Sequence, residues 1–446
     1  MAIDARVKEV ELSTEEFRYR TPIKFGGVAL DRVTLLHAAV TVELDGGRVA
    51  RGTASTPLGN VWAFPSRGLS YAQTLAAMRA VADEVATIYA RSTVAGHPID
   101  LTHTLEPEFA TAADHVARRQ NLGEPVPALA TLVAASPIDA ALHDAYGKAL
   151  GLNAFRTLTP EFLRHDLGHY LGAEFAGLRL HDSVRATPQA TMPVYHLVGA
   201  LDPLTATDVS QTVGDGLPET LADWIATDGL THLKIKLAGD DLAWDLRRVL
   251  GVNAVAEAAR PDGAWAYSLD FNERCPDAAY LVELLTRLRR ESPQAYERVQ
   301  YVEQPTARDL AANRRNVMHA AAALKPVVID ESLVDLESLK LAREMGYTGA
   351  AFKACKGQSQ TLLLAAAAQV YGMYRCVQDL TCPGAALVQS AGLAARLPGV
   401  VAIEANARQY VPAANAGWEP RYPGLFTVRG GVLATGQLTG VGLGAG

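Results

Sequence analysis

The chain has 446 residues, more than one hydrophobic core usually supports, so we expect two or three domains with one of them large. Hydrophobic residues make up 49% of the sequence and charged residues 20%, as in ordinary soluble globular proteins rather than disordered, collagenous or membrane chains. The formal net charge of -7, from 41 basic and 48 acidic residues, gives no basic surface for a phosphate backbone and argues against nucleic acid as a partner.

The N-terminus from Met1 to Thr14 mixes charges with single apolar residues and lacks the continuous apolar core of a signal peptide. The longest apolar run, Leu362–Ala368, is too short to span a bilayer, so we expect no membrane association. Four cysteines without a C-x-x-C pair indicate reduced thiols rather than a disulfide framework or a zinc site. These features predict a cytoplasmic protein.

Two segments near the N-terminus have the alternation of β-strands. They are Val7–Phe17 and Thr34–Leu44. Asp45-Gly46-Gly47 follows the second segment directly and precedes Val49, so we predict a hairpin turn there.

Helical spacing of apolar residues comes next, over Tyr71–Tyr89 and Ser136–Leu150. The second helix is predicted to begin at a Ser136-Pro137 cap. Strands followed by helices, rather than interleaved with them, predict an α+β capping domain over residues 1–152. We interpret residues 153–191, which show no sustained period, as an insertion or linking segment.

After residue 191 the pattern changes to eight short β-branched runs separated by helical stretches. The runs are Val194–Leu197, His232–Leu237, Ala266–Asp270, Val299–Glu303, Val327–Asp330, Ala350–Lys353, Cys376–Leu380 and Val400–Glu404. Eight strands alternating with helices predict an α/β fold, a closed (β/α) barrel of the TIM type, over residues 192–404. Residues 405–446 are expected to return to the capping domain, with the glycine-rich part after Gly430 forming hairpins beside it.

Each predicted barrel strand from the second to the eighth ends on a side chain that can carry charge. In chain order these are Lys236, Asp270, Glu303, Asp330, Lys353, Asp379 and Glu404, separated by 23 to 34 residues, about one strand and helix each. Barrel active sites are assembled from the C-terminal ends of successive strands, so we expect all seven at one mouth. Burying so many unpaired charges by chance would be prohibitively costly, so the series predicts a functional site.

Three carboxylates, Asp270, Glu303 and Asp330, stand at the centre of this series. Hard oxygen donors from three neighbouring strands suit an octahedral divalent cation such as Mg²⁺. A single strand-end acid more often caps the next helix, but that interpretation does not explain three in register. Zinc is disfavoured because no His or Cys occupies an equivalent position.

Lysines flank the three carboxylates. In Leu233-Lys234-Ile235-Lys236-Leu237 the period of two places Lys234 and Lys236 on one face, although K-x-K is also common on exposed edge strands. Lys353 offers a second base across the barrel. A lysine must be deprotonated to act as a base, and burial together with nearby cations such as Mg²⁺ and Lys234 would lower its pKa toward neutrality.

As a set, K-x-K, D-x-N, E-Q-P, D-E-S and a sixth-strand lysine resemble the enolase superfamily, specifically the muconate lactonizing enzyme subgroup of the mandelate racemase/muconate lactonizing enzyme family. Ser136–Asp144 is similar to the helix that joins that family's capping domain to its barrel. The resemblance spans roughly Thr21 to Glu404. It implies a Mg²⁺-dependent enzyme that removes the proton beside a substrate carboxylate and forms an ene-diolate.

The resemblance also implies roles for single residues. Asp270, Glu303 and Asp330 would bind Mg²⁺, Lys236 and Lys353 would be the two acid/base groups, and Lys234 would tune Lys236 and touch the substrate carboxylate. Asn272, Glu331, Asp379 and Glu404 are expected to support these groups or contact the substrate, and Phe25 and Trp62 from capping-domain loops to wall it. Ordinary packing at the domain interface is an equally good interpretation of Phe25 and Trp62.

Three departures from the family pattern concern substrate recognition. The usual Gly-Gly after the second lysine of strand six is Gly357-Gln358, and the acid often found after strand seven is replaced within Leu387–Ser390. Glu404 and Asn406 match only part of the Asp-x-Asp with which dipeptide epimerases of the family hold an ammonium group. That partial match hints at an amino-bearing substrate.

Two lysines favour a racemase, epimerase or cycloisomerase acting on a small-molecule carboxylate, and we expect a homo-oligomer. A dehydratase of a sugar acid or of a succinylbenzoate-like compound is the alternative, since one lysine suffices to remove the proton. A barrel that binds an acid without turning it over is a third possibility, against which the retained lysines and carboxylates argue.

One further motif, His165-x-x-x-His169, has the helical spacing of a two-histidine metal site. The residues between them lack the glutamate of H-E-x-x-H. We therefore interpret the two histidines as a surface or interface pair.

Overall fold

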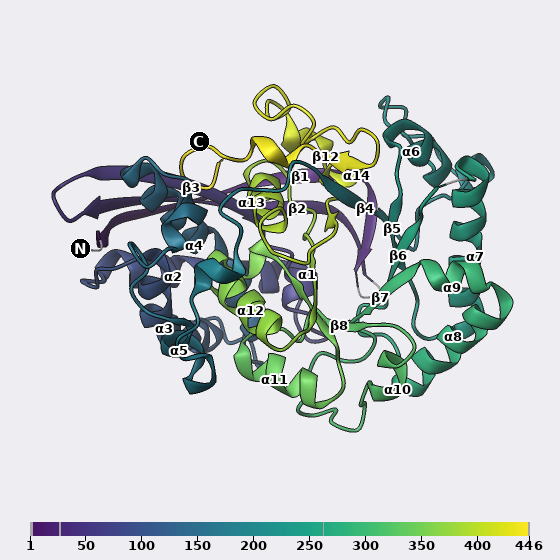
Figure 1. Ribbon diagram of the computed structural model, residues 1–446, viewed down its shortest axis with the longest axis horizontal. Helices are drawn as coiled ribbons and strands as arrows, with labels where there is room; N and C mark the ends of the chain where they lie inside the picture. The colour runs from purple at the N-terminus through teal and green to yellow at the C-terminus, as the bar shows by residue number, and fades with distance from the viewer. Residues whose placement is uncertain (1–2, 26–27, 262, 445–446) are drawn as a thin grey trace.

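The computed structural model describes residues 3–25, 28–261 and 263–444. Its N-terminal part contains an antiparallel sheet in the order β1-β2-β3 (Figure 1). β1 (Ala5–Phe25) and β2 (Val28–Leu44) contain the two predicted strands but are longer, and β3 (Val49–Pro57) pairs with β2 across the predicted turn. Gly46 and Gly47 have φ angles of 101° and 82°, which explains why the turn has glycines.

Four helices follow the sheet, and together with β1–β3 they form what we call the cap. They are α1 (Asn60–Ala63), α2 (Tyr71–Arg91), α3 (Pro98–Arg119) and α4 (Ala128–Leu150). α2 contains the predicted helix and begins with a capping box between Ser70 and Gln73. α2 packs on α3 and α4, and α4 packs on β2 and β3, so the helices cover the sheet.

α4 begins at Ala128, so the predicted helix start at Ser136 was wrong. Pro137 lies inside the helix, where it cannot donate a backbone hydrogen bond to the carbonyl of Val133. The Ser136 hydroxyl donates to that carbonyl instead, at 3.0 Å, which keeps the buried acceptor satisfied. The Ser-Pro pair therefore allows a proline within the helix rather than starting a new one.

Residues 153–191 form short helices with little regular structure between them. These are η1 (Ala154–Leu158), α5 (Leu167–Leu171), η2 (Ala173–Phe175) and η3 (Leu180–Ser183). Their buried apolar side chains include Phe155, Leu167 and Phe175. η1 packs on α4, whereas α5 and η3 pack on α12 (Gln358–Val370), so this segment lies against both the cap and the barrel.

The barrel consists of eight parallel strands, β4 to β11, closed by pairing of β11 with β4. They are β4 (Met192–Val198), β5 (His232–Lys236), β6 (Ala266–Asp270), β7 (Val299–Glu303), β8 (Val327–Ile329), β9 (Gly349–Phe352), β10 (Tyr374–Val377) and β11 (Ile403–Glu404). All eight predicted strands are thus confirmed, with small differences at their ends.

Helices alternate with the strands and surround the barrel (Figure 1). They are α6 (Leu221–Asp228), α7 (Leu242–Ala259), α8 (Ala278–Glu291), α9 (Pro293–Arg298), α10 (His319–Ala322), α11 (Leu336–Glu344), α12 and α13 (Ala385–Ala394), with the short turns η4 (Ala206–Asp208) and η5 (Ala354–Lys356). The predicted α/β class and TIM-type architecture are therefore confirmed.

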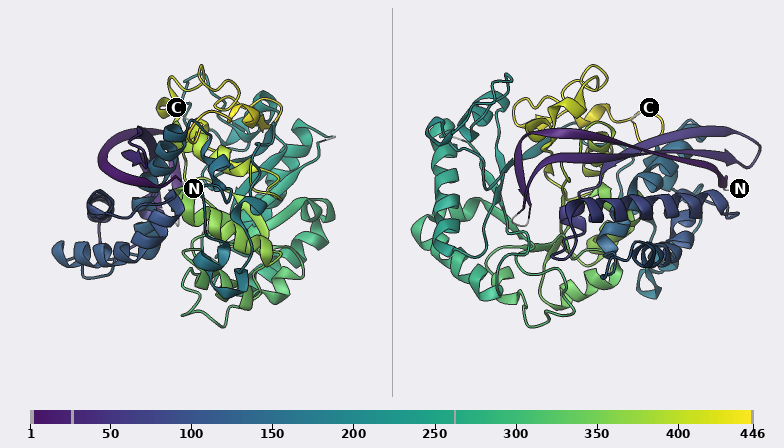
Figure 2. Two further views of the ribbon diagram at one scale, coloured as in Figure 1. Left: turned by 60° about the vertical axis from the view of Figure 1, so that its left-hand side comes forward. Right: turned by 180° about the vertical axis from the view of Figure 1, so that it is seen from behind.

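The C-terminal segment runs from the barrel back to the cap (Figure 2). It contains α14 (Ala407–Tyr410), η6 (Pro412–Asn415), β12 (Val432–Leu433) and η7 (Thr435–Gln437), and β12 pairs antiparallel with the start of β4. Near its end, the Leu443 amide donates to Asp144 Oδ1 on α4 at 2.9 Å, while Asp144 Oδ2 accepts from the Thr53 amide on β3 at 2.9 Å. One buried carboxylate thus joins β3, α4 and the C-terminal segment.

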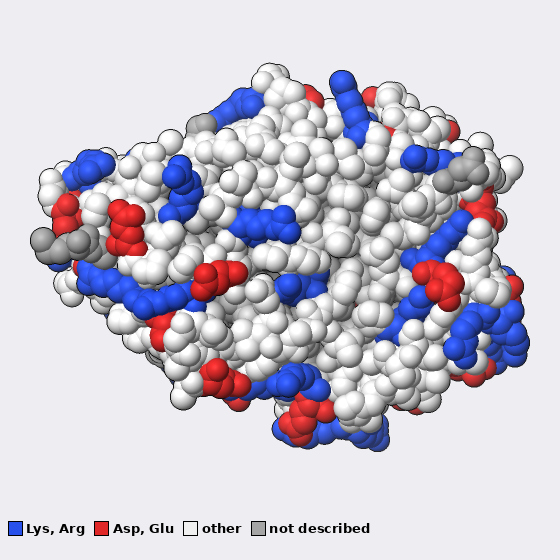
Figure 3. Space-filling model, in the orientation of Figure 1, with Lys and Arg blue, Asp and Glu red and all other residues white. Residues whose placement is uncertain are grey.

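Basic and acidic side chains are scattered over the face shown in Figure 3, with uncharged surface between them. All four cysteines are free and buried, as expected of reduced thiols. Within the residues that the structure describes, no helix is long and apolar enough to cross a membrane.

Candidate active site

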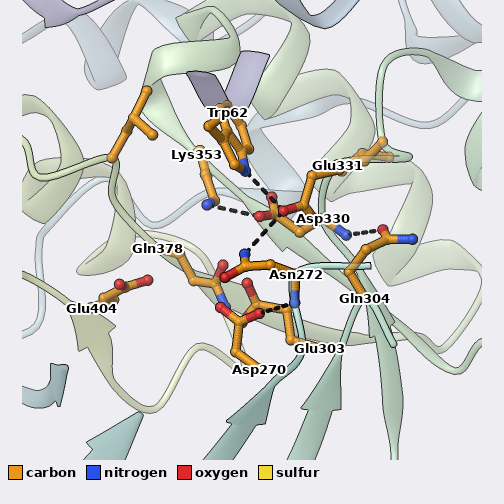
Figure 4. Close-up of polar contacts among 12 residues, drawn as sticks. Trp62, Asp270, Asn272, Glu303, Gln304, Asp330, Glu331, Lys353, Gln378 and Glu404 are labelled. Carbon is orange, nitrogen blue, oxygen red and sulfur yellow. Dashed lines mark hydrogen bonds and ion pairs between the residues drawn. The ribbon is translucent and has the colours of Figure 1, made fainter. Parts of the chain in front are cut away.

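One layer inside the barrel is uncharged and is formed by Tyr195, Tyr301, Val328, Ala351, Cys376 and Ala402. Side chains two residues apart on a strand share a face. The residue two positions after each of these therefore also points into the barrel, one layer nearer the C-terminal ends of the strands. On five of these strands this next layer consists of Glu303, Asp330, Lys353, Gln378 and Glu404 (Figure 4). The period of two therefore places a polar layer directly above an uncharged layer.

β5 and β6 complete this polar group with Lys236 and Asp270, and with Lys234, which lies two residues before Lys236 on β5 and reaches the same carboxylates. In the sheet register, Lys236 is the partner of Asp270, and Asp270 is the partner of Glu303. Each of the seven ionisable residues in this group is buried, with an exposed fraction of 7% or less. The structure therefore brings the predicted lysines and carboxylates together at the end of the barrel.

Lys234 lies among three carboxylates. Its Nζ is 3.0 Å from Asp270 Oδ2 and 2.9 Å from Glu303 Oε1. It is also 2.9 Å from Glu404 Oε2 on the opposite side. Although burial opposes its charge, these carboxylates hold the pKa of Lys234 well above its usual value. Lys234 is therefore a charged partner of the carboxylates.

Lys236 and Lys353 lie on either side of this group. Lys236 Nζ is 2.5 Å from Asp270 Oδ2 and donates to Asn272 Oδ1 at 2.8 Å. Lys353 Nζ is 2.8 Å from Asp330 Oδ2. Since β5 and β9 are four strands apart in an eight-stranded barrel, the two ammonium groups approach the centre from opposite sides.

Asp330 has a second lysine partner, Lys356, which follows Lys353 by three residues. Lys356 Nζ lies 3.2 Å from Asp330 Oδ1 and donates to the backbone carbonyls of Asp330 at 2.5 Å and Leu333 at 3.3 Å. Gln304, from the E-Q-P motif, accepts a hydrogen bond from the Asp330 amide at 2.9 Å. The backbone that carries Asp330 is thus held from two neighbouring strands.

Trp62 reaches the site from α1 of the cap. Its Nε1 donates to Glu331 Oε1 at 2.9 Å, and Asn272 Nδ2 donates to the same oxygen at 3.1 Å. The ammonium groups of Lys353 and Lys356 lie 4.6 Å and 5.7 Å from the centre of a Trp62 ring. Trp62 is 5% exposed, so it closes the Lys353 side of the site from above.

The carboxylates differ in their protonation. Burial favours the neutral acid, but the charges of Lys234 and Lys236 outweigh it and keep the pKa of Asp270 well below its usual range. Glu303 behaves in the opposite way, because burial and the neighbouring charge of Asp270 raise its pKa well above the usual value. Ionisation of Glu303 is therefore opposed by its surroundings, and an added positive charge nearby would favour it.

The same balance acts around Asp330. Burial alone would raise the pKa of Asp330, but the charges of Lys353 and Lys356 outweigh burial and lower this pKa to about 2. Burial disfavours the charge of Lys353, yet Asp330 raises its pKa above the usual value, whereas burial lowers the pKa of Lys356. In this arrangement Lys353 is a charged acid rather than a neutral base.

Asp379 is turned away from this layer. Gln378, one residue earlier, donates to Glu303 Oε2 in the barrel centre. Asp379 Oδ2 accepts from the backbone amides of Cys382 and Asn406, both at 3.2 Å, and burial followed by the charge of Glu404 raises its pKa to about 7. The side chain that completes the layer on β10 is thus an amide, which a search for ionisable groups misses.

The predicted Mg²⁺ ligands have the oxygen donors that this cation prefers. Each carboxylate oxygen of Asp330 is buried with one lysine contact, at 2.8 Å and 3.2 Å, and a carboxylate oxygen can accept more than one bond, so acceptor capacity remains. Five acids, Asp270, Glu303, Asp330, Glu331 and Glu404, face four lysines, Lys234, Lys236, Lys353 and Lys356, which leaves one excess negative charge when all are ionised. The donor set therefore fits a divalent cation.

The carboxylates are not gathered around one point, however. Among the described residues, no three His, Cys, Asp or Glu side chains lie together closely enough to hold a metal ion. Lysine ammonium groups lie between them, as Lys234 shows. A cation would have to take over contacts that these ammonium groups make.

A cleft of about 860 Å³ lies between the cap and the barrel, next to the site. Its barrel side includes Asn272, Glu331 and Arg308, and its cap side includes Trp62 and the apolar residues Val28, Leu30, Val61, Phe64 and Leu69. The cleft gives a small molecule a route toward Asn272 and Lys236. Phe25 ends β1, and its side chain lies outside the described part of the chain.

Backbone strain gathers at the same end of the barrel. Among the described residues, the non-glycine positions with positive φ include Asn272 (43°), Glu273 (70°), Gln304 (31°) and Thr381 (56°), all just beyond barrel strands. Such conformations cost free energy and persist where the surrounding structure imposes them, as is common at functional sites.

The histidines of the H-x-x-x-H motif lie elsewhere, at α5. The rings of His165 and His169 stack with centroids 3.9 Å apart, and the ring of His103 lies 5.6 Å from that of His169. Stacked parallel rings cannot both point a nitrogen lone pair at one ion, which agrees with the absence of a metal-holding cluster among the described residues.

Comparison with solved structures identifies the same fold in several enzymes. The dipeptide epimerase of Enterococcus faecalis, complexed with Mg and the dipeptide L-Leu-L-Tyr, has a TM-score of 0.63 and 16% identity over 98% of this chain and 99% of that chain. The muconate lactonizing enzyme of Pseudomonas fluorescens, complexed with muconolactone, has a TM-score of 0.61 and 17% identity, over 99% of this chain and 96% of that chain. The L-Ala-D/L-Glu epimerase of Bacillus subtilis has a TM-score of 0.58 and 17% identity, over 91% of this chain and 90% of that chain.

No curated protein matches the chain. Residues 217–445 match the family described as enolase C-terminal domain-like, which is more than half of the 446 residues. This range contains all the strand-end lysines and carboxylates described above. The chain therefore belongs to the enolase superfamily, in the family of mandelate racemase and muconate lactonizing enzyme.

Proposed function

We propose that this protein is a Mg²⁺-dependent isomerase that removes the proton on the carbon beside a substrate carboxylate. The observation that carries the proposal is the order of side chains on five successive strands: lysine, three carboxylates, lysine. Lys236 and Lys353 are the two ends of this order, and they are buried on opposite sides of a closed barrel. Membership of the superfamily supports the same chemistry.

Asp270, Glu303 and Asp330 would hold the cation. When bound, Mg²⁺ would balance the excess negative charge of the site and stabilise the charge that develops on the substrate carboxylate as the proton leaves. Lys234 would remain a fixed positive charge, since Glu404 offers it a carboxylate outside the ligand set. The raised pKa of Lys353 depends on Asp330, so a weaker contact with Asp330 would make its amine a better base.

Two amines on opposite sides can serve the two faces of one carbon. One lysine accepts the proton from its face, and the other donates a proton to the opposite face, which inverts the configuration. Asn272 orients Lys236 through the bond to Nζ, and the ring of Trp62 lies against the ammonium group of Lys353. Racemisation or epimerisation would use both lysines for proton transfer, and cycloisomerisation would use one for proton transfer and the other as a charged partner of the developing ene-diolate.

The substrate is proposed to be a small carboxylate with an apolar extension. The cleft of about 860 Å³ has room for a molecule of the size of a dipeptide, and its cap side combines apolar residues with the charged side chains of Asp31, Arg32 and Arg67. Two of the similar structures are dipeptide epimerases, which makes dipeptides and N-acyl amino acids the first compounds to test. The four free, buried cysteines support a reducing compartment such as the cytoplasm.

The first test is exchange of the α-proton in D₂O, followed by proton NMR with Mg²⁺ present. We expect exchange from at least one of L-Leu-L-Tyr, L-Ala-L-Glu and a panel of N-acyl amino acids. For a racemase or epimerase, Lys236→Ala should stop exchange from one configuration and Lys353→Ala from the other, and both should lose net inversion.

Other outcomes would change the assignment. Loss of exchange in only one lysine variant would indicate a one-base reaction, such as a cycloisomerase or dehydratase. Exchange that persists from both configurations in both variants would show that neither lysine is the base, and the proposal would be wrong.

A further inference from the structure

Asp139, on α4 of the cap, is buried at the surface where the cap meets the barrel, with an exposed fraction of 3%. Its Oδ2 accepts a hydrogen bond from the Ser359 amide at 2.8 Å, and its Oδ1 accepts from the Ser359 hydroxyl at 2.6 Å. The Thr102 hydroxyl on α3 also donates to Oδ1, at 2.8 Å. One carboxylate of the cap thus binds a residue of α12 through two hydrogen bonds.

Ser359 is the second residue of α12, where backbone amides have no partner within the helix. The residue before α12 is Gly357, with a φ of 103°, and it has no side chain to accept a hydrogen bond from the first turn. A Cβ at Gly357 would lie 3.4 Å from Asp139 Oδ2. Asp139 therefore serves as the capping group of α12, although it belongs to a different helix.

The first turn of α12 in turn holds the backbone of Lys353. The Thr361 hydroxyl donates to the Lys353 carbonyl at 3.0 Å, and the Lys356 amide donates to the same carbonyl at 3.0 Å. α4 also packs directly on η5, the turn between Lys353 and α12. The path from Asp139 to Lys353 is thus a short series of buried contacts.

Lys236 has a different kind of support. It ends β5, where it is the sheet partner of Asp270, and its Nζ contacts Asp270 and Asn272 of the barrel. Asp139 therefore supports the Lys353 side of the site through the start of α12, and none of its contacts given above leads to Lys236, whose backbone is set by the strand register of the barrel.

We propose that Asp139 is a positioning residue for Lys353, so that this residue of the cap helps to set the geometry of one acid/base group through the start of α12. The inference rests on the proposed two-lysine function. It predicts a loss of activity that depends on the configuration of the substrate, which a general loss of stability would not produce.

The test compares α-proton exchange from the two epimers of one substrate, L-Leu-L-Tyr and L-Leu-D-Tyr or the N-acyl amino acid pair that exchanges fastest. We expect Asp139→Ala to slow exchange from the Lys353-dependent configuration by about 100-fold, the effect of a displacement of about 1 Å at a reacting group. Exchange from the Lys236-dependent configuration should change by less than about threefold, as expected when geometry there is kept. Asp139→Asn, which keeps one acceptor for the Ser359 amide, should restore part of the lost rate.

Two further variants keep the test valid if Asp139→Ala folds poorly. Ser359→Ala removes the hydrogen bond from the hydroxyl and keeps the one from the backbone amide. It should therefore slow exchange less than Asp139→Ala does, and again mainly from the Lys353-dependent configuration. Val133→Ala is the control for stability, because Val133 is fully buried on the same helix and its truncation leaves a cavity. It should change exchange from both epimers equally.

The outcomes separate this inference from the proposed function. If Lys236→Ala and Lys353→Ala do not each stop α-proton exchange from a different configuration of the substrate, the proposed two-lysine function is wrong. If they do, but Asp139→Ala and Ser359→Ala slow both configurations equally or neither, Asp139 has only a structural role and the inference is wrong.

Discussion

Among single residues, Trp62 makes two separable contacts with the site. Its N–H binds Glu331, and its ring lies against Lys353. We expect Trp62→Phe, which keeps a ring but removes the N–H, to lower kcat about 10-fold, the effect of about 1.4 kcal/mol on the barrier. Trp62→Ala should lower it about 100-fold, because the contact with the ammonium group is also lost.

Steady-state kinetics on the substrate found by the exchange screen would measure both effects. Trp265→Phe is a matched control, since the buried Trp265 also donates its N–H, to the Arg260 carbonyl at 3.2 Å. Equal rates in the two Trp62 variants would contradict a role for the ring.

The three proposed metal ligands make a prediction about binding as well as activity. Asp270→Asn, Glu303→Gln and Asp330→Asn should each abolish turnover and weaken Mg²⁺ binding, because one anionic ligand of three is lost. Titration calorimetry with Mg²⁺ measures the affinity. Glu283→Gln, on the exposed face of α8, should leave it unchanged. Unchanged affinity in all three site variants would refute the metal assignment.

Among the secondary-structure elements, α3 carries an acid that should make stability depend on pH. Burial, followed by the charges of Asp139 and Asp335, raises the pKa of Glu106 to about 7. The folded state therefore keeps Glu106 protonated at pH values where the unfolded chain, with a pKa near 4.3, has lost the proton. The contribution of Glu106 to stability is complete below about pH 4 and is lost as the pH rises to about 7.

Glu106→Gln removes this titration. Its free energy of unfolding should equal that of the unchanged protein near pH 4 and exceed it near pH 8, by up to about 3 kcal/mol. Chemical denaturation at several pH values measures the difference. Glu108→Gln, an exposed acid on the same helix, is the control. A difference that does not grow with pH would show that Glu106 titrates normally.

A second prediction at this scale concerns α5. Replacing His165 and His169 together with Ala should leave turnover within a few-fold, because the pair stacks on α5 and contacts none of the strand-end lysines or carboxylates. Circular dichroism would show whether the variant is folded. A complete loss of turnover in a folded variant would mean that the motif belongs to the catalytic machinery.

The barrel could be predicted from the sequence because buried parallel strands are short, continuous apolar runs, and those from the second to the eighth are each followed or ended by an ionisable residue. The β10 position could not be read in the same way. Asp379 is the ionisable residue there, but the alternation that begins at Cys376 turns Gln378 toward Glu303 instead. Charge was the wrong guide at this position, and the period of two was the right one.

In the cap, the sequence pattern alone predicted the wrong start for one helix. Ser136 and Pro137 have the chemistry of a helix start, yet the same two residues lie inside α4 because the serine hydroxyl satisfies the carbonyl that the proline leaves open. The contacts of Trp62 and Asp139 with the barrel were also beyond the sequence. They join positions more than 200 residues apart, as the Asp139–Ser359 separation of 220 shows.

For the whole molecule, the site belongs to both parts of the chain. The barrel supplies the lysines and the carboxylates, while the cap supplies Trp62 above them and, as we propose, the group that fixes α12. Because the charged groups are buried and paired, removal of any one partner leaves a buried charge without compensation, which is more harmful than loss of a surface pair. Changes in the cap should therefore affect chemistry that takes place in the barrel.

The partners of the Asp144 carboxylate are synthesised at very different times. A ribosome makes α4 and β3 when about a third of the chain exists, but the amide of Leu443 that fills Asp144 Oδ1 is made only near residue 443. Until then, Oδ1 lacks the backbone amide from which it accepts in the native structure, and only Oδ2 can have its native partners, the Thr53 amide at 2.9 Å and the Lys148 ammonium group at 2.8 Å. The hydrogen bonds of this carboxylate, which lies between α4 and β3, can therefore be completed only after the C-terminal segment has been synthesised.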